Sequence, residues 1–515
     1  MPIISIIIFI LTSIILIILY IVFSHYYINC NDWKFGLNNT YIKEDIHKYG
    51  CKIRLPKTCA YKMGKFIFDN SRKNNTLCNE KVDTKRKLLE NSKNKYINLE
   101  TKRIGYPLPI KNKNIHKAIS INSDEVLKFF QNNYIDMDNR TLIQIIFNDS
   151  QPEIIIDYNK NPFGELNINV QYNKTLSDER KRNEINSKPY SENIIILFID
   201  SVSRAYSIRS LKKTLNFFEQ FMKYEGSYNK KFPSENFHSF QFFKFHSFGF
   251  YTRFNYPPVF YGRIKGKLVR NIKFLKEFGY VTGFVNDMCL REPTNTGHNM
   301  TEDELSDHEM LICDPNMKHI FSSSIRCLYN KITASYALEY GNQFWRKYNQ
   351  NRKYLCINLE DGHEGSMEVL KYADETIYSF FKDLYNDNLL KSTAIFLISD
   401  HGTHSPSPYY ATEFYHIERY LPMFYLICND RKNVSYSEQY KNININQQIL
   451  ITGYDIYNTI FHLVIGDNYR SIKNKTEKFE SPKTSLGESL FNKINPNERK
   501  PTNYYKMTDK VCVFE

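Results

Sequence analysis

From residue 193 onward, short continuous apolar runs alternate with segments whose apolar residues recur at helical spacing. Continuous runs of this kind are typical of strands that are buried on both faces of a parallel sheet. Helical spacing of the apolar positions predicts amphipathic helices. The alternation predicts an α/β fold with an open, mostly parallel sheet flanked by helices. The apolar runs lie at residues 194–199, 280–285, 354–359, 394–398 and 422–428, and the helical patterns at 207–224, 268–278 and 367–384.

Residues 24–190 have a different pattern of apolar and polar positions, because their apolar runs are short and are separated by Lys/Asn-rich intervals. The runs at residues 118–121, 142–147 and 154–156 predict short strands and turns around a modest core. The changes in this pattern divide the chain into four parts. These are an N-terminal apolar segment (1–23), a smaller cysteine-containing N-terminal region (24–190), a main α/β domain (191–467) and a C-terminal extension packed on the core (468–515).

Residues 3–23 are 21 consecutive residues without a charge. As a helix this segment would be roughly 31 Å long, which is enough to cross the hydrocarbon layer of a membrane. No small-residue cleavage site follows it, and the exit contains Tyr26 and Tyr27, as in an interfacial aromatic belt. The sequence therefore favours an uncleaved signal anchor, with a cleaved signal peptide as the alternative.

Two features favour a luminal or extracellular body, and hence a single-pass type II membrane protein. Cys30, Cys51, Cys59 and Cys78 lie in a region of weak core potential, where disulfides would add stability, although inert buried thiols are the alternative. N-glycosylation sequons are frequent, but roughly six would arise by chance in so Asn-rich a chain. The sequons stand at Asn38, Asn74, Asn139, Asn148, Asn173, Asn299, Asn433 and Asn474.

The composition is that of a globular protein, with 42% hydrophobic and 24% charged residues, and this excludes wholesale disorder. The 69 basic residues outnumber the 55 acidic ones, which gives a net charge of +14. This charge favours anionic partners such as phosphate groups, sulfated glycans or membrane surfaces. The lysines are scattered among Asn and Ile and do not cluster, so we expect no nucleic-acid binding.

Acidic and imidazole side chains follow three of the predicted strands. Asp200 ends the first, Glu360-Asp361-Gly362-His363 ends another, and Asp400-His401 ends a third, with His404 nearby. The carboxyl ends of parallel strands meet at one sheet edge, and mixed carboxylate and imidazole ligands suit zinc or manganese. Asp200 alone could instead cap the next helix. The combination predicts a metal site at this edge.

Three motifs together resemble the alkaline phosphatase/sulfatase superfamily. They are Ile-Asp-Ser-Val-Ser-Arg at 199–204, the Gly-x-x-Thr-x-x-Asn spacing of Gly249, Thr252 and Asn255, and Ser-Asp-His-Gly at 399–402. The chain is most similar to the membrane-anchored or secreted branch of unassigned function, whose fold the 191–467 domain is then expected to share. The resemblance covers most of residues 51–515. It extends to Cys51, Pro56 and Cys78, and to Gly487-Glu488-Ser489-Leu490-Phe491 with Arg499 and Cys512.

The resemblance implies a role for each matching residue. Thr252 would be the nucleophile, although its aromatic surroundings also suit an ordinary strand residue, and Asn255 would bind a substrate oxygen. One divalent metal would be held by Asp200, Thr252, Asp400 and His401. His363 and His404, with Asp361 or Glu360, would approach a second metal. Zinc is the first choice, with manganese or calcium as alternatives, and one or two ions are expected.

Some positions depart from the superfamily pattern. Phe250-Tyr251 stands where a polar pair is usual, and Leu359 stands where two-metal members commonly have Asp, so the second metal site is in doubt. A sulfatase proper is disfavoured, because Cys313-Asp314-Pro315 lacks the Arg that its motif requires. A serine hydrolase is disfavoured as well, because no G-x-S-x-G motif occurs.

The sequence thus predicts a membrane-anchored, metal-dependent hydrolase or transferase that acts on phosphate or sulfate esters through a Thr nucleophile. Its expected partners are an anionic ester substrate and a membrane, which the N-terminal helix enters. The alternative is a catalytically weakened ectodomain that keeps the fold in order to bind anionic glycans or a protein.

Overall fold

The computed structural model describes the C-terminal two thirds of the chain almost continuously and the N-terminal third in short pieces. The described residues are 2–26, 28–29, 52–53, 58–59, 103–104, 119–121, 142–147, 153–157, 165–184, 187–222, 237–263, 271–287, 304–312, 326–328, 331–403, 413–429, 434–471, 487–499 and 512–513.

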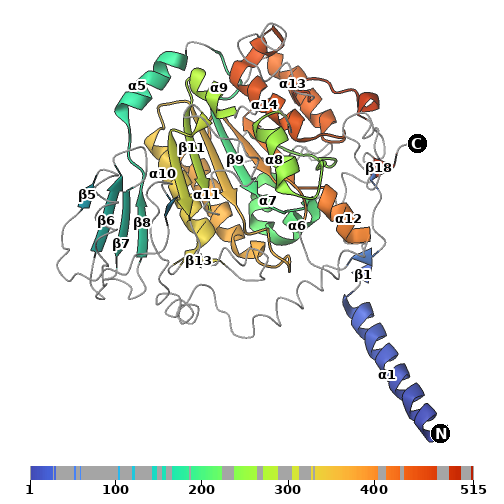
Figure 1. The fold of residues 1–515 in the computed structure, drawn as a ribbon. Coiled ribbons are helices and arrows are strands. Elements are labelled where there is room, and N and C mark those ends of the chain that lie inside the picture. Colours follow the sequence, from blue (N-terminus) through green and yellow to red (C-terminus); the bar gives the residue numbers. More distant parts are fainter. Residues whose placement is uncertain are drawn as a thin grey trace.

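A mixed, mostly parallel sheet of eight strands forms the centre of the molecule (Figure 1). The strands from β16 to β4 are parallel to one another, whereas β17 is antiparallel to both of its neighbours. The predicted α/β fold with a mostly parallel sheet is confirmed. In sheet order the strands are β10 (Phe237–Gln241), β17 (Phe424–Asn429), β16 (Thr393–Ile398), β9 (Asn193–Ile199), β15 (Lys353–Leu359), β11 (Val281–Asn286), β12 (His308–Ile312) and β4 (Arg103–Ile104).

Both faces of this sheet are buried, and each face carries its own hydrophobic core. Along β9 the side chains of Ile195 and Leu197 enter one core, and those of Ile196 and Phe198 enter the other. This two-sided burial is the reason why β9 is continuously apolar. Over the first face lie α6 (Arg204–Ser210), α7 (Lys212–Glu219), α10 (Thr333–Lys347) and α11 (Asp374–Asn386), and over the second lie α8 (Thr252–Phe260), α9 (Asn271–Glu277), α13 (Val434–Asn446) and α14 (Gly453–Ile465).

The helix predicted over residues 207–224 is divided into α6 and α7, which meet at Leu211. The Asp374 carboxylate accepts hydrogen bonds from the backbone N–H groups of Lys213 and Thr214, at 2.8 and 2.9 Å. A distant side chain therefore caps the start of α7, so that the chain can begin a new helix there. The remaining described helices are α1 (Pro2–Tyr26), α5 (Lys174–Asn183) and α12 (Glu413–Tyr420), with short 3₁₀ turns at Leu370–Tyr372, Gly466–Asn468 and Pro496–Glu498.

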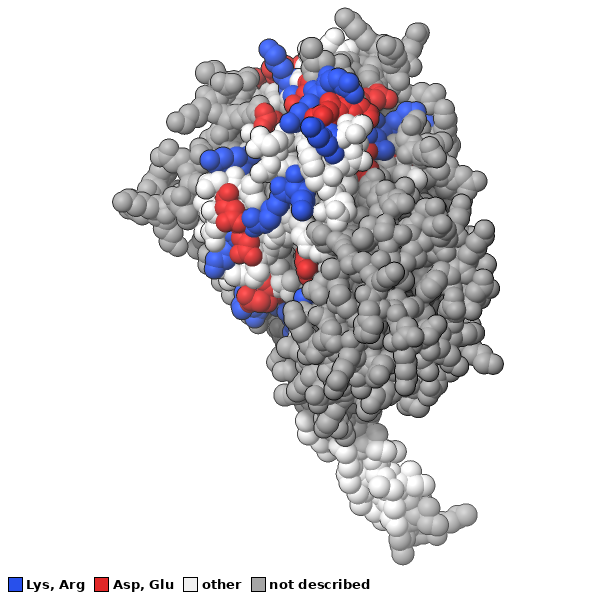
Figure 2. All heavy atoms as spheres, turned by 90° about the vertical axis from the view of Figure 1, so that its left-hand side faces the viewer, with Lys and Arg blue, Asp and Glu red and all other residues white. Residues whose placement is uncertain are grey.

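The described surface carries charges of both signs. On the face shown in Figure 2, Lys and Arg side chains are interspersed with Asp and Glu. Arg346 pairs with Asp387 at 2.5 Å, and Lys371 pairs with Glu368 at 2.7 Å. The basic net charge is therefore not gathered into a single patch on the described part of this face.

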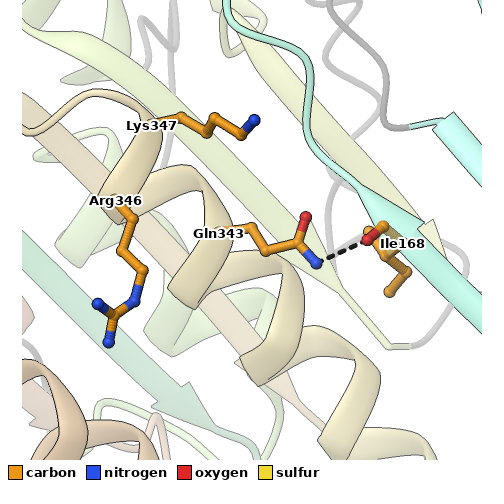
Figure 3. Close-up of a pocket in the computed structure, with 4 residues that line it drawn as sticks. All are labelled: Ile168, Gln343, Arg346 and Lys347. Atoms are coloured by element: carbon orange, nitrogen blue, oxygen red, sulfur yellow. Dashed lines mark hydrogen bonds between the residues drawn. The ribbon is translucent and has the colours of Figure 1, made fainter.

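A second sheet of four strands lies beside α10 (Figure 1). Gln343 of α10 joins it to the main domain, because its side chain donates to the Ile168 carbonyl at 2.6 Å and accepts from Val170 N–H at 3.0 Å. A cavity of about 420 Å³ lies at this junction, lined by Ile168, Gln343, Arg346 and Lys347 (Figure 3). The end of α10 precedes β15, so this cavity lies at the opposite edge of the main sheet from the strands' carboxyl ends. The second sheet contains β5 (Ile119–Ile121), β6 (Leu142–Phe147), β7 (Glu153–Asp157) and β8 (Glu165–Asn169).

The N-terminal helix α1 extends away from the body of the molecule (Figure 1). Within the described residues, no helix meets the combined length and hydropathy that a membrane crossing requires. Cys356 and Cys428 are buried thiols. Three short strand pairs complete the described chain, namely β1 (Ile28–Asn29) with β3 (Thr58–Cys59), β13 (Cys327–Leu328) with β14 (Lys331–Ile332), and β18 (Cys512–Val513) with β2 (Lys52–Ile53).

Candidate active site

The predicted carboxylate and imidazole residues converge at the carboxyl ends of two adjacent strands. Asp200 follows β9, and Asp400 and His401 follow β16, which pairs with β9 in parallel register. All three side chains are buried. The sheet therefore fixes the relative positions of these groups, as expected for residues that follow neighbouring parallel strands.

Thr252 is the first residue of α8, and its hydroxyl faces the same group. Thr252 Oγ1 donates to Asp200 Oδ2 at 3.1 Å and lies 3.4 Å from His401 Nε2. Packing fixes the helix against the sheet, because the Tyr256 ring meets the Phe198 ring edge to face. Thr252 is thus a helix-terminal residue, and the strand alternative for it was wrong.

The His401 ring is held in one tautomer. Its Nδ1 lies 2.7 Å from the carbonyl oxygen of Gly402, and because a carbonyl can only accept, Nδ1 carries the proton. The lone pair of Nε2 then faces acceptor oxygens, with Asp400 Oδ2 at 3.2 Å and Asp200 Oδ1 at 3.8 Å. A ligating histidine is commonly held in this way by a hydrogen bond to its other nitrogen.

The arrangement fits a divalent cation. In the described part of the chain, the ligand atoms of Asp200, Asp400 and His401 all lie within 4.8 Å of one another. Asp200 Oδ1 and Asp400 Oδ2 are buried and make no hydrogen bond. Buried acceptors without donors are costly unless a cation compensates them. One nitrogen and several oxygens form a donor set that suits zinc or manganese.

The pKa values of these three residues also indicate that the site lacks a compensating positive charge. Burial raises the pKa of Asp200 well above its usual range, and the charges of Asp400 and Glu360 raise it further. Burial also raises the pKa of Asp400. The pKa of His401 is lowered well below its usual range, again mainly by burial, so the ring is neutral and can ligate.

The residues predicted for a second metal do not join this group. Arg326 Nη2 donates to Asp361 Oδ2 at 3.0 Å and to Asp287 Oδ2 at 2.5 Å. Asp361 is therefore neutralised by a guanidinium. His363 is buried, and its pKa is lowered to about 4, mainly by burial. Among the described residues neither Asp361 nor His363 belongs to the ligand cluster at Asp200, and His404 lies outside the described residues.

Asn255, the predicted substrate contact, makes four hydrogen bonds within its own loop. Its Nδ2 donates to the carbonyls of Gly249 and Tyr251 at 2.9 and 3.0 Å, and its Oδ1 accepts from the N–H groups of Phe248 and Gly249 at 2.7 and 3.2 Å. A side-chain amide has two donor hydrogens and two acceptor lone pairs, and all four are used here. Asn255 closes the loop that leads to Thr252.

Sequence analysis missed four supporting residues. The Ser201 backbone N–H donates to Asp400 Oδ1 at 3.3 Å, and Ser201 has a positive φ of 63°. Ser399 Oγ accepts from Val202 N–H at 2.8 Å. These serines flank the Asp motifs, so their proximity could have been read from the sequence.

The other two supporting residues are Arg419 and Gly362, and nothing in the sequence indicates that they support the site. The Arg419 guanidinium donates to the carbonyls of Phe250 and Thr403, at 2.5 and 3.3 Å, which ties the Thr252 loop to the His401 loop. At Gly362, a Cβ would lie 2.3 Å from the carbonyl oxygen of Asp200. Only glycine lets these two loops approach so closely.

The Asp307-His308 pair, at the start of β12, lies at the opposite end of the strands from Asp200. Asp307 Oδ2 accepts from the backbone and hydroxyl of Thr282, and its Oδ1 accepts from Arg180 Nη2 at 2.6 Å. His308 Nε2 contacts the Tyr348 hydroxyl at 2.6 Å. These contacts join β12, β11 and α5, so the pair is structural.

Part of the chain matches one protein family, and several solved structures resemble it at low sequence identity. Residues 273–513, just under half of the chain, match the family described as "Protein of unknown function (DUF229)". This range includes His363, Asp400 and His401 but not Asp200 or Thr252. No curated protein sequence matches the chain.

Several solved structures resemble it. A protein in the alkaline phosphatase superfamily from Vibrio parahaemolyticus is 13% identical with a TM-score of 0.36, covering 57% of this chain and 76% of that one. The C-terminal periplasmic domain of EcEptC from Escherichia coli is 13% identical with a TM-score of 0.36, covering 54% and 83%. The lipoteichoic acid synthase LtaP from Listeria monocytogenes is 11% identical with a TM-score of 0.35, covering 63% and 83%. Likenesses of this size carry no argument about activity, so the chemistry of this chain has to be argued from its own residues.

Proposed function

We propose that the chain is a metal-dependent hydrolase or transferase of phosphate esters, with sulfate esters as the second substrate class. The observation that carries this proposal is the convergence of the Thr252 hydroxyl on the buried, hydrogen-bond-poor group of Asp200, Asp400 and His401. A hydroxyl, two carboxylates and a neutral imidazole at one point form a metal-binding set with a nucleophile inside it.

Thr252 would carry the transferred group between the two halves of the reaction. In the first half, Thr252 Oγ1 bonds to phosphorus, the bond from phosphorus to the leaving alkoxide breaks, and the hydroxyl proton passes to Asp200 Oδ2, which already accepts its hydrogen bond. The leaving alkoxide takes a proton from solvent. In the second half, water or an acceptor alcohol attacks phosphorus and releases a proton to solvent, while the Thr252 oxygen leaves and takes back the proton held by Asp200. A divalent cation held here would lower the pKa of the Thr252 hydroxyl and stabilise charge on the transferred group.

We infer a single ion per active site. Arg326 already supplies positive charge to Asp361, one of the ligands expected for a second ion, and to its neighbour Asp287. A guanidinium is always charged and forms directed hydrogen bonds to two carboxylates, so it can replace a cation electrostatically. The position of Leu359, which has no ligand atom, supports the same inference.

We also propose that α1 is an uncleaved membrane anchor and that the body is luminal or extracellular. The large apolar side chains described on α1 are exposed on every side, because four consecutive residues, which together go round the helix, are all exposed: Ile6 at 58%, Ile7 at 51%, Ile8 at 57% and Phe9 at 72%. A helix that is apolar all round requires burial in a protein core or a membrane. It extends away from the body of the molecule, so a membrane is the environment that suits it (Figure 1).

Metal content and turnover test the proposed chemistry together. Purified protein should hold about one zinc or manganese ion per chain and should hydrolyse p-nitrophenyl phosphate faster than p-nitrophenyl sulfate, with loss of activity in a chelator and recovery on re-addition. Asp400→Asn and His401→Ala should remove the ion, whereas the surface variant Asp387→Asn should keep it. Unchanged metal content in the site variants would contradict the assignment. Bound metal without turnover of any ester would favour the weakened, glycan- or protein-binding ectodomain.

A further inference from the structure

Two exposed aromatic rings flank the predicted nucleophile. Outside α1, only four large hydrophobic residues in the described chain are strongly exposed, namely Tyr172, Tyr251, Phe254 and Ile445. Tyr251 and Phe254, at 49% and 37% exposure, stand one residue before and two residues after Thr252. Half of the exposed large hydrophobics of the described body are therefore at the mouth of the site.

Both rings lie against the same guanidinium, and their own centres are 6.5 Å apart. The Arg253 guanidinium carbon lies 4.7 Å from the centre of the Phe254 ring and 5.3 Å from that of Tyr251. The Phe254 ring in turn lies against Gly249, where a Cβ would come within 3.0 Å of it. The rings bind the face of the cation and leave its N–H groups at the edge for a ligand.

Arg253 is exposed, and with the described residues it makes no hydrogen bond or ion pair. It also stands in the first turn of α8, which contains no acidic residue. A cation near a helix N-terminus is unfavourable, because the helix dipole already places positive charge there. Stability of the helix therefore does not explain this residue, whereas an anion that approaches Thr252 would meet both the guanidinium and the helix end.

We propose that Arg253, which lies against the rings of Tyr251 and Phe254, binds a second anionic group of the substrate, so that the enzyme prefers esters that carry another phosphate, sulfate or carboxylate group beside the reacting one. This inference rests on the proposed function and names its substrate class. The chemistry is one of hydrogen bonds from a planar guanidinium to anionic oxygens, for which Arg is better suited than Lys.

A matched pair of substrates tests the inference. Phosphate release is measured with glucose 6-phosphate and glucose 1,6-bisphosphate, on the metal-loaded full chain and on Arg253→Gln, Arg253→Lys and the control Arg182→Gln, which changes an exposed residue of α5. Arg253→Gln should raise KM for the bisphosphate about tenfold, change KM for the monophosphate less than about twofold and leave kcat unchanged. The KM of Arg253→Lys for the bisphosphate should lie between those of Arg253→Gln and the unaltered chain. The control Arg182→Gln should have the same KM as the unaltered chain. Equal effects on both substrates, or no effect, would overturn the proposal.

A binding measurement separates this proposal from the proposed function. If the unaltered chain releases phosphate from neither sugar, the proposed hydrolytic function fails, and calorimetric binding of glucose 1,6-bisphosphate to the metal-loaded protein decides the role of Arg253. A dissociation constant about tenfold higher in Arg253→Gln supports the anion site, and equal constants refute it. Arg253→Gln could instead weaken binding to phosphatidylglycerol vesicles and leave bisphosphate binding unchanged. In that case Tyr251, Arg253 and Phe254 form a membrane contact, and the proposal is wrong.

Discussion

Asn255 determines the shape of the loop that delivers Thr252 to the metal group. Its four hydrogen bonds go to backbone groups of Phe248, Gly249 and Tyr251. A loop closed largely by one side chain depends strongly on that side chain, since its loss removes four hydrogen bonds at once. We therefore expect Asn255 to act by positioning Thr252.

Asn255→Ala is expected to lower both activity and stability. We predict a loss of kcat corresponding to about 2–4 kcal/mol and a fall in the free energy of unfolding of about 1–3 kcal/mol. Asn255→Asp keeps the acceptor oxygens for Phe248 and Gly249 and should lose less of both. Chemical denaturation and steady-state kinetics check this. Lost activity with unchanged stability would instead mean that Asn255 contacts the substrate, as the sequence resemblance implied.

Glu360 makes the stability of the metal-free protein depend on pH. Both of its carboxylate oxygens are buried without a hydrogen bond, and burial, followed by the charge of Asp287, raises its pKa from 4.5 to about 8. The folded state thus retains a proton that the unfolded chain has already lost. This contribution to stability is present below the unfolded pKa and disappears as the pH rises through the folded one.

In a chelator, the free energy of unfolding should therefore fall by about 1 kcal/mol per pH unit between about pH 6.5 and 8. Below this window His363, whose pKa is lowered to about 4, acts in the opposite direction, because its unfolded form gains a proton. Near pH 8 the lowered pKa of Lys353 begins to oppose the trend. Denaturation curves at several pH values check this, and the slope should be smaller but not zero in Glu360→Gln, because the pKa values of Asp200, Asp287 and Asp400 are raised as well. A rise in stability across the window would contradict the burial of an unpaired carboxyl.

At the scale of elements, the C-terminal signature joins the extension to the helix that supports α8. The Arg499 guanidinium donates to both carboxylate oxygens of Asp455 in α14, at 2.9 and 3.1 Å. The Glu488 backbone N–H donates to the same carboxylate at 2.8 Å. Since α14 packs against α8, the extension from residue 487 to 499 belongs to the same folded unit as the active site.

Arg499→Met should destabilise the fold by about 3–5 kcal/mol, because it leaves the Asp455 carboxylate buried without its cation. Arg346→Met is the matched control, since it breaks an ion pair with Asp387 that is 41% and 49% exposed and should change stability by at most about 1 kcal/mol. The denaturant midpoints of the two variants show which substitution destabilises the fold more. Similar midpoints would mean that the Arg499–Asp455 pair contributes no more than a surface pair.

The sequence could predict the strands and their polar ends because both follow from local rules. A strand buried on two faces must be apolar throughout, and residues after adjacent parallel strands must meet, so Asp200, Asp400 and His401 could be placed together. Contacts between residues far apart in the chain could not be predicted. The Asp374 cap that divides α6 from α7 and the Arg326 side chain that neutralises Asp361 are of this kind, and no periodicity or motif marks them.

At the scale of the whole molecule, the account requires a body that is held at a membrane and exposed to the secretory lumen. The sequon at Asn173 stands at the N-cap of α5, where the side-chain oxygen accepts from Leu176 N–H and Lys174 begins an exposed turn. Expressed in a eukaryotic secretory system, the protein should remain in the carbonate-washed membrane fraction, retain its N-terminus and lose mass on treatment with an N-glycosidase. A mature N-terminus near residue 25, or a mass unchanged by the glycosidase, would contradict this topology.

The role of Thr252 as nucleophile can be tested by trapping the transferred phosphate or sulfate group on its side chain. Metal-loaded protein is mixed with a slow phosphate ester, quenched in acid and digested, and the peptides are mapped by high-resolution mass spectrometry, which also distinguishes phosphate from sulfate. The account predicts one modified residue, Thr252, with the label absent from Thr252→Ala and reduced in Thr252→Ser, while both variants keep the metal at Asp200, Asp400 and His401. A label on Ser201 or Ser203, or turnover by Thr252→Ala at the unaltered rate, would contradict it.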